Sequence, residues 1–461
     1  MKTSLRIRLG VLLVLAAALA GCEGPCSTIK SINGPQLEAN GVDLSRYVAV
    51  GTSLTSGYMS GGIVDRHQVN SYPALFAQQI GKTVSVDGGS GSFTQPTVNM
   101  DGIPALTEVK SYRPLIVNNT GRTTGAPTNF SQNGAYHNLG IPGAVALDLV
   151  DTTHYDQTAA PVFRTNFTYF NLIQRNRGSL LAQALSLAPT LLSIEYGANE
   201  VLGPTTAGVA PSSATNSGYA AIMTAALNTI HTVSPNTRVA VFNVPNVTSI
   251  PFFTTFPPAT VNGTTGLPMA LVGANGPLEP NDLVLLTAGS LLAAGTGIPA
   301  GGVNFVNPTV VGTGQPLPES VILRSAEVAQ AQAETDQINA VVDSVAARPF
   351  VAKVDIHDYF DDIAVNGLRI GANEYTSDFI TGGLFSLDGV HPNPLGYALM
   401  ANRMIEAVNA RFGSAIPRVN PAQYATATAS AARPADLPRY PGAIEGLDES
   451  LDLALPFRSR R

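Results

Sequence analysis

The sequence has few cysteines and few charged residues. Of its 461 residues only two are cysteines, Cys22 and Cys26, and both lie close to the N-terminus. Neither a disulfide framework nor a thiolate metal site is therefore available to the folded part of the chain. Charged residues amount to 13%, with 26 Lys and Arg against 32 Asp and Glu. This acidic excess argues against a nucleic-acid partner.

Glycine, proline and hydrophobic residues are plentiful. The chain has 44 glycines and 33 prolines, and 44% of its residues are hydrophobic. These hydrophobic residues suffice for a full core, so we expect a globular protein. Low charge combined with many turn-forming residues suits an exported protein with long surface loops better than a cytosolic helical one.

The chain begins with a short apolar run, Val11–Ala20, which three basic residues precede. This arrangement is typical of a secretory signal peptide, and the run is too short to span a membrane comfortably. The run ends in Leu19-Ala20-Gly21-Cys22, which resembles the lipobox of bacterial lipoproteins. An ordinary signal peptide followed by an incidental cysteine is the alternative.

The lipobox resemblance implies a lipid anchor. Cleavage before Cys22 would leave this residue, in acylated form, as the first of the mature chain. Several acyl chains hold a protein firmly to a bilayer. The next residue is Glu23 rather than Asp, which favours the outer membrane of a Gram-negative bacterium. We expect a signal peptide at residues 1–21, a polar tether at residues 22–43, and a lipid-anchored protein of the cell envelope.

Short apolar runs alternate with helical segments through much of the chain. Helices that alternate with buried strands are typical of a parallel sheet with crossover helices, so we predict an α/β domain at residues 44–415. The predicted strands are Tyr47–Val50, Lys82–Asp87, Thr190–Glu195, Arg238–Phe242 and Phe350–Ile356. The predicted helices are Ser71–Gln79, Gly178–Ala188, Tyr219–Val233, Glu319–Ala347 and Leu395–Phe412.

Three segments have no clear period. Residues 88–135 are rich in Gly, Ser, Thr and Asn, and we interpret them as an insertion. Residues 247–318 contain much Pro, Gly and Thr, with helical character only at Asp282–Ala294. A segment this long inside a compact domain is usually functional or disordered, and we interpret it as a cap or lid. Residues 416–461 are rich in Ala, Pro and Thr, and we expect a poorly ordered tail.

Four short motifs carry polar groups suited to catalysis. Ser53 lies in Gly51–Leu54, on a turn after a predicted strand, where an open parallel sheet exposes residues to a ligand. Glycines in Asn138–Gly143 allow backbone N–H groups to approach a substrate oxygen, and Gly197–Glu200 offers an Asn side chain as a donor. In Asp388–Pro392 a carboxylate three residues before a histidine can orient the imidazole. Each motif alone has an ordinary explanation, such as a helix cap, a loop or a turn.

Together, and in this order, the four motifs resemble the motif blocks of the SGNH/GDSL hydrolase family over about residues 47–412. The resemblance implies that Ser53 is the nucleophile, that His391 is the base and that Asp388 stands beside it. It also implies that Gly143 and Asn199 donate to the oxyanion together with the Ser53 amide. The implied fold is a three-layer α/β/α doubly wound domain with a mainly parallel five-stranded sheet in flavodoxin-like order, and the two insertions would form a rim over the site.

Two positions depart from the family pattern. Thr52 stands where the family usually has Asp before the serine, and Glu200 replaces the Asp of the third block. The Asp before the serine supports the site and does not attack, so the nucleophile is retained while the positioning of its loop is left open. The longer first block, Gly51–Tyr58, and the run Ser71–Gln78 further resemble a lipoprotein branch of the family.

The resemblance implies an esterase or lipase that forms an acyl-enzyme on Ser53 and uses no metal or organic cofactor. A carbohydrate O-deacetylase is one alternative, which a mainly polar pocket would favour; an apolar pocket would favour lipid, aryl or acyl esters. A non-catalytic envelope lipoprotein that binds through the same fold is the other alternative, and Thr52 is its only support. We also expect an ester as the ligand, membrane contact through the N-terminal lipid, and a monomer.

Other histidines give weaker signals. His357 is followed by Asp358 at a predicted strand end, and we interpret the pair as part of an exposed turn. His67 and His154 are too isolated for a metal site. His231 lies late in a predicted helix, where its charge would meet the helix dipole favourably.

Overall fold

The computed structural model describes residues 40–86, 89, 91–112, 115–119, 121–153, 167–212, 218–305, 307, 309–425, 443–444 and 451. The predicted signal peptide, the predicted lipidation site Cys22 and most of the predicted tether lie outside these ranges, as does His154. Within them, no helix is both long and apolar enough to cross a membrane.

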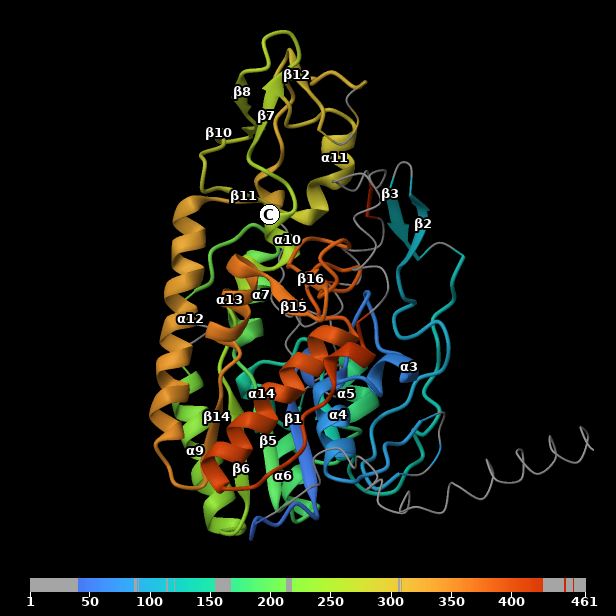
Figure 1. Ribbon diagram of the computed structural model, residues 1–461, viewed down its shortest axis with the longest axis vertical. Helices are drawn as coiled ribbons and strands as arrows, with labels where there is room; N and C mark the ends of the chain where they lie inside the picture. Colours follow the sequence, from blue (N-terminus) through green and yellow to red (C-terminus); the bar gives the residue numbers. More distant parts are fainter. Residues whose placement is uncertain are drawn as a thin grey trace, which may run out of the picture.

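The centre of the fold is a sheet of five parallel strands (Figure 1). Its members are β1 (Tyr47–Gly51), β4 (Asn138–Gly140), β5 (Leu191–Glu195), β6 (Arg238–Phe242) and β14 (Val351–Val354). They pair in the order β14-β6-β5-β1-β4, so the chain starts near the middle, crosses to one edge and then returns toward the other. This confirms the predicted flavodoxin-like, doubly wound sheet.

One predicted strand is wrong. At Lys82–Asp87 the described residues make only an isolated bridge, between Val84 and Phe93, and the edge strand is formed instead by Asn138–Gly140. The sequence of this strand gives no apolar run, because only its middle residue is large and apolar. Gly140 also packs tightly on the first catalytic motif, where an added Cβ would lie 2.4 Å from the Ser56 nitrogen.

Side chains alternate between the two faces of the sheet, as the pleat requires. Tyr47 and Ala49 belong to one hydrophobic cluster, and Val48 and Val50 belong to another. The first cluster is covered by α4 (Tyr72–Gln79) and α14 (Pro394–Phe412), which pack against each other. The second is covered by α6 (Leu180–Ser186), α9 (Tyr219–Val233) and α12 (Ser325–Ala346). The protein therefore has the three-layer architecture that the sequence predicted.

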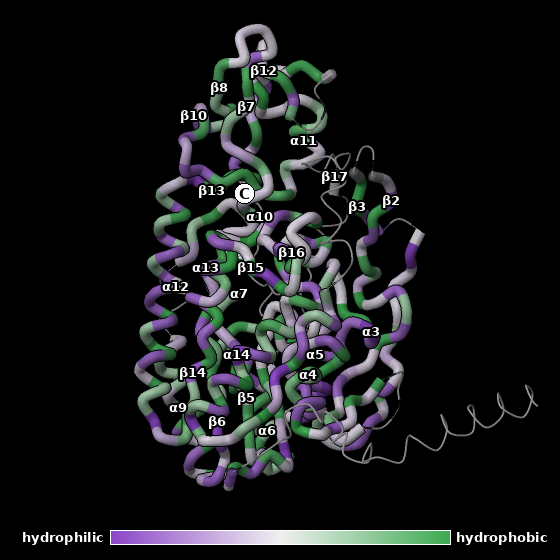
Figure 2. Tube along the Cα trace, viewed as in Figure 1, coloured by the Kyte–Doolittle hydropathy of each residue, from purple (hydrophilic) through white to green (hydrophobic). Residues whose placement is uncertain are grey.

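The predicted start is right for one covering helix and wrong for another. The Ser71 side chain accepts from the Ala74 amide at the start of α4, as predicted. Along α12 the tube in Figure 2 changes repeatedly between hydrophilic and hydrophobic colours, as expected for a helix with one face on the core. The predicted helix Glu319–Ala347 starts only at Ser325, because Ile322–Leu323 form β13 and pair with Leu283–Val284, which form β11.

The remaining helices are short. They are α2 (Ser53–Ser56), α3 (Asp65–Gln68), α5 (Phe167–Ile173), α7 (Ala198–Thr205), α10 (Pro251–Thr254), α11 (Gly289–Ala293) and α13 (His357–Asn366). Single 3-10 turns lie at Ala146–Leu149, Val247–Ser249, Leu286–Ala288, Glu319–Val321 and Pro421–Gln423. A small antiparallel pair, β15 (Leu368–Ile370) and β16 (Asn373–Tyr375), follows α13.

The two predicted insertions contain structure of their own. The first holds the hairpin of β2 (Glu108–Tyr112) and β3 (Leu115–Asn118). The second projects beyond the sheet (Figure 1). Besides β11, its strands are β7 (Ala259–Asn262), β8 (Pro268–Ala270), β9 (Val272–Gly273), β10 (Gly276–Pro277) and β12 (Gly302–Val303). The predicted helix Asp282–Ala294 is only partly present, because β11 takes its first residues and the helix α11 begins at Gly289.

The folded chain continues beyond residue 415, where the sequence placed the end of the domain. Val419 is buried and exchanges two hydrogen bonds with the Asn402 side chain of α14. Much of the predicted tail lies outside the described residues. Of its described parts, Ala443–Ile444 form β17 and pair with β3, and Leu451 is buried in the second cluster.

Candidate active site

The predicted site residues lie at the carboxyl ends of the central strands. Ser53 begins α2 directly after β1, and Asn199 lies in the first turn of α7 directly after β5. His391 lies shortly before α14. Because parallel strands end at the same edge of a sheet, residues far apart in the sequence meet there.

Ser53, His391 and Asp388 form one hydrogen-bonded chain. His391 Nε2 lies 2.9 Å from Ser53 Oγ, and His391 Nδ1 lies 3.0 Å from Asp388 Oδ2. With Nδ1 donating to the carboxylate, Nε2 is free to accept from the serine hydroxyl. Ser53 is 4% exposed, and Asp388 and His391 are each 1% exposed, so bulk water does not compete for these bonds.

Asp388 is held by several donors. Its Oδ1 accepts from the amides of Val390 at 2.9 Å and His391 at 2.8 Å, and from the Ser386 hydroxyl at 3.1 Å. Burial alone would raise the pKa of Asp388, but the neighbouring His391 and these hydrogen bonds hold it below its ordinary value. Asp388 is therefore suited to remain a carboxylate beside a histidine that gains a proton.

The turn that joins Asp388 to His391 requires a glycine. Gly389 has a φ of +70°, and a Cβ there would lie 2.7 Å from Leu286 of the second insertion. The imidazole itself contacts the Tyr58 ring, with centroids 4.6 Å apart. This ring contact and the hydrogen bond to Asp388 together fix the plane of His391.

The turn that carries Ser53 is tight. A Cβ on Gly51 would lie 2.1 Å from Thr55 Oγ1, so only glycine fits. Thr52 caps α2, its side chain accepting from the Leu54 amide at 3.4 Å, and Gly57 ends the helix in the left-handed conformation. The predicted nucleophile therefore sits on a short helix fixed at both ends.

Three groups are predicted to donate to a substrate oxygen: the Ser53 amide, the Gly143 amide and the Asn199 side chain. Neither the Ser53 amide nor the Gly143 amide has an acceptor among the described residues. Gly143 is fixed from both sides, because the Ile141 amide donates to the Gly51 carbonyl at 2.9 Å and Asn199 Nδ2 donates to the Ala144 carbonyl at 2.8 Å. The second hydrogen on Asn199 Nδ2 remains for a ligand. Gly143, unlike Ser53 and Asn199, does not line the cavity described below.

Two buried glutamates lie next to the site; the sequence reasoning missed Glu195 and noted Glu200 only as a departure from the family pattern. Glu195, the last residue of β5, bonds to Thr52 and Thr55, and burial raises its pKa to about 7. Glu200 accepts from the Ala146 amide at 2.7 Å, and burial raises its pKa to about 7 as well. The available signal for Glu195 was a single charged residue ending an otherwise apolar strand.

The other histidines that the structure describes lie outside the site. The interpretation of His357 as part of an exposed turn is wrong, because it begins α13 and its Nδ1 lies 2.8 Å from the Val244 carbonyl oxygen. Burial lowers the pKa of His67 to about 4, which keeps it neutral. Among the residues that the structure describes, no group of three or more His, Cys, Asp or Glu could hold a metal ion.

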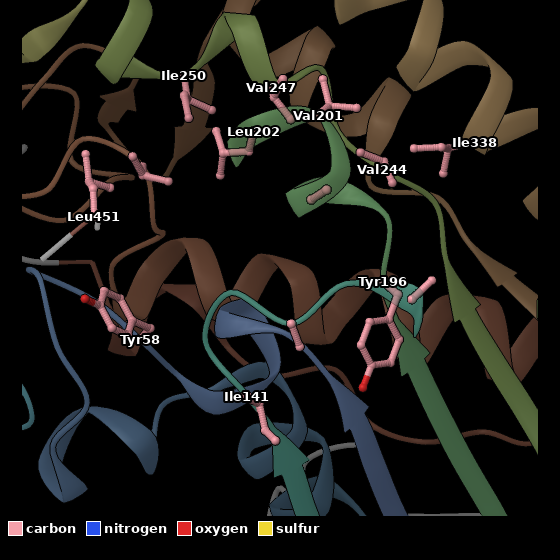
Figure 3. Close-up of a cluster of buried hydrophobic side chains, with 14 of the residues drawn as sticks. Tyr58, Ile141, Tyr196, Val201, Leu202, Val244, Val247, Ile250, Ile338 and Leu451 are labelled. Atoms are coloured by element: carbon pink, nitrogen blue, oxygen red, sulfur yellow. The ribbon is translucent and has the colours of Figure 1, made fainter. Parts of the chain in front are cut away.

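A cavity that is open to solvent meets Ser53, Asn199 and His391. One part of its wall is formed by Leu202 of α7 with Val247 and Ile250, which lie close to it in Figure 3. None of the described residues that line the cavity is Asp, Glu, Lys or Arg. Its further lining side chains include Leu54, Phe360, Ile363, Ala364, Leu384, Phe385 and Met400. The cavity is therefore suited to an apolar group.

The site and fold define a hydrolase that works at the carboxyl edge of a doubly wound sheet, and the comparisons with known proteins give its family. The sequence profile of the GDSL-like lipases and acylhydrolases matches residues 47–404. The chain therefore belongs to the GDSL-like lipase/acylhydrolase family, and it is a GDSL-type esterase or lipase. A comparison with curated proteins gives no significant match.

Two solved structures are similar to this chain. One is an extracellular lipase from Streptomyces rimosus, 16% identical, with 79% of this chain and 98% of that chain covered and a TM-score of 0.33. The other is described as a GDSL-like lipase from Parabacteroides merdae, 14% identical, with 80% and 98% covered and a TM-score of 0.29.

Proposed function

We propose that this protein hydrolyses carboxylic esters with apolar acyl chains through an acyl-enzyme on Ser53. The observation that carries the proposal is the hydrogen-bonded chain Ser53–His391–Asp388, whose serine faces an uncharged cavity. A hydroxyl is a poor nucleophile at neutral pH, and a histidine already in contact with it can take its proton as it attacks.

The first half of the reaction forms the acyl-enzyme. Ser53 Oγ attacks the ester carbonyl carbon while its proton passes to His391 Nε2, and Asp388 stabilises the imidazolium. The carbonyl oxygen becomes an oxyanion, which accepts from the Ser53 and Gly143 amides and from Asn199. Each such donor stabilises the transition state by about 3 kcal/mol. His391 then gives its proton to the leaving alkoxide, and the alcohol departs.

The second half repeats these steps with water. His391 takes a proton from a water molecule, the resulting hydroxide attacks the acyl carbonyl, and the same donors hold the oxyanion. Return of the proton to Ser53 Oγ releases the carboxylic acid and restores the free enzyme.

The lining of the cavity favours acyl esters over the alternative substrates. A carbohydrate O-deacetylase would need polar groups to hold the sugar hydroxyls, whereas most of the lining residues are apolar and only Asn246, Ser249 and Ser377 add polar side chains beyond the site itself. Burying an acyl chain there contributes about 0.8 kcal/mol for each methylene. The non-catalytic alternative rested on Thr52 alone, and the intact contacts of Ser53 weigh against it.

We further propose that the enzyme is monomeric and is held at the outer membrane by lipid on Cys22. The lipobox-like sequence before Cys22 supports this location. Labelling of growing cells with an alkyne palmitate analogue should tag the wild-type protein and leave Cys22→Ser untagged. An equally tagged Cys22→Ser variant would refute the anchor.

The test of the activity uses the full-length protein in mild detergent and p-nitrophenyl esters from acetate to palmitate. Esters with long acyl chains should be preferred, and Ser53→Ala should lose the activity while keeping a folded circular dichroism spectrum. Ser186→Ala, on α6, serves as the matched control and should remain active. A folded wild-type protein that cleaves none of these esters would refute the proposal.

A further inference from the structure

Glu195 lies directly behind the turn that carries Ser53. It is the last residue of β5, is 3% exposed, and stands opposite Gly51 in the parallel pairing of β1 with β5. No described residue offers it a Lys or Arg partner in an ion pair. Burying a carboxyl group without a positive partner costs free energy. The hydrogen bonds of Glu195 must therefore offset that cost.

Every hydrogen bond found for the Glu195 carboxyl group leads to the residues on either side of Ser53. Its Oε2 accepts from the Thr52 amide at 3.1 Å, from the Thr52 hydroxyl at 2.8 Å and from the Thr55 hydroxyl at 3.0 Å. Its Oε1 accepts from the Thr52 hydroxyl at 3.0 Å. One carboxyl group thus fixes the residue before the nucleophile and the residue two positions after it.

Because of these bonds, the Ser53 amide is the one backbone donor among Thr52, Ser53 and Leu54 that remains available to a substrate. The Thr52 amide is taken by Glu195, and the Leu54 amide is directed to the Thr52 hydroxyl, which Glu195 itself holds. The Ser53 amide has no acceptor among the described residues. A small rotation of this turn would move the Ser53 hydroxyl away from His391 and its amide away from the oxyanion.

We infer that Glu195 is a positioning residue for the nucleophile: it accepts hydrogen bonds from Thr52 and Thr55, and so fixes the turn in which Ser53 Oγ meets His391. This inference rests on the proposed function, since it concerns the reactivity of Ser53. It also accounts for Thr52, because a hydroxyl at this position donates to the carboxyl group from β5.

The role requires an acceptor in the right place rather than a charge. A glutamine can present its carbonyl oxygen at the Oε2 position and keep the bonds made there. A leucine of similar size cannot accept, and it leaves an amide and two hydroxyls to find other partners. The two substitutions therefore separate hydrogen-bond geometry from the volume of the side chain.

The experiment compares wild type, Glu195→Gln and Glu195→Leu, with Glu334→Gln as a control for loss of a buried carboxylate, here on α12. The readouts are kcat and KM on p-nitrophenyl butyrate, the rate of Ser53 labelling by a fluorophosphonate, and the melting temperature. We expect Glu195→Leu to lower both kcat and the labelling rate by about 100-fold, with KM within about threefold of wild type. Glu195→Gln should keep most of the activity, and Glu334→Gln should match wild type.

A second variant tests the same inference if the Glu195→Leu protein does not fold. Thr52→Val removes the hydroxyl that Glu195 accepts from and keeps the Thr52 amide, so we expect about a tenfold fall in kcat and in labelling rate. A purely structural role would lower the melting temperature and leave the labelling rate of the folded protein at the wild-type value.

The outcomes separate the two proposals. If wild type is active and the folded Glu195→Leu and Thr52→Val proteins react at the wild-type rate, the inference about Glu195 is overturned and the proposed function stands. If wild type neither cleaves an ester nor reacts with the fluorophosphonate, the proposed function fails, and the role of Glu195 fails with it.

Discussion

The backbone N–H of Gly61 donates to Asp388 Oδ2 at 3.1 Å, so the loop after α2 is joined to the carboxylate beside His391. The same oxygen faces His391 Nδ1 at 3.0 Å. The segment that presents the nucleophile and the segment that presents the base are therefore held together by direct hydrogen bonds. Loss of the Asp388 charge should affect both the orientation of His391 and this junction.

Replacing Asp388 by Asn should lower kcat/KM on p-nitrophenyl esters by about 10³-fold, because the amide neither stabilises the imidazolium nor fixes the required tautomer. KM should change much less than kcat. Asp378→Asn is the matched control, since Asp378 is exposed and its carboxylate bonds only to Thr376 among the described residues. Equal activities of the two variants would show that Asp388 has no part in the proton transfer.

Helix α13 allows the cavity to be tested with neighbouring residues. Ala364 lines the cavity, whereas Val365 is 83% exposed. Ala364→Phe should fill part of the space and lower kcat/KM for a decanoate ester about tenfold relative to an acetate ester. Val365→Phe, one residue further along the helix, should leave the ratio unchanged. The idea that this cavity holds the acyl chain is wrong if both variants keep the wild-type ratio of decanoate to acetate hydrolysis.

The parts of the site that were predictable from the sequence depend on short-range patterns. Ser53 and Asn199 directly follow apolar strands, and the three-residue spacing of Asp388 and His391 is visible in a single turn. These features need no knowledge of which strands are neighbours. The order of the strands came from the family resemblance rather than from the pattern itself.

The parts that were missed depend on contacts between distant segments. Glu195 meets Thr52 across 143 residues, and nothing in the local sequence of either residue indicates the pairing. The strand Asn138–Gly140 has too few apolar residues for its period to be recognised. Helix α13 was missed because its polar residues, such as His357 and Asp358, suggested a turn, although Phe360 and Ile363 turn toward the cavity.

The raised pKa values of the two buried glutamates predict how the free energy of unfolding changes with pH. The pKa values of Glu195 and Glu200 are raised to about 7 in the folded protein, against 4.5 for an ordinary glutamate. Below pH 4.5 both are protonated whether the chain is folded or not, so their contribution to stability is fully present. Between pH 4.5 and 7 the unfolded chain releases these protons while the folded chain keeps them. The free energy of unfolding should therefore fall as pH rises, by an amount on the order of a few kcal/mol.

Urea denaturation at several pH values between 4.5 and 8 measures this effect. Glu200→Gln should flatten the pH dependence, because one of the two proton-binding groups is gone. A wild-type protein whose stability rises steadily over this pH range would show that both carboxyl groups are ionised throughout.

Gly51 tests how closely the nucleophile turn is packed. An alanine Cβ there would lie 2.1 Å from Thr55 Oγ1 and 2.7 Å from the Glu195 carbonyl oxygen, so the turn must move. We expect Gly51→Ala to lower the free energy of unfolding by about 1–3 kcal/mol and to reduce the rate of Ser53 labelling. Gly218→Ala is the matched control, because among the described residues its Cβ would meet only Ile222, at an ordinary 3.5 Å. That variant should be as active as wild type, and about 0.5 kcal/mol more stable if it limits the unfolded chain. If Gly51→Ala has the same Ser53 labelling rate and the same free energy of unfolding as Gly218→Ala, the turn can accommodate a Cβ at residue 51. The close packing of Thr55 and Glu195 around the turn then does not govern the reactivity of Ser53.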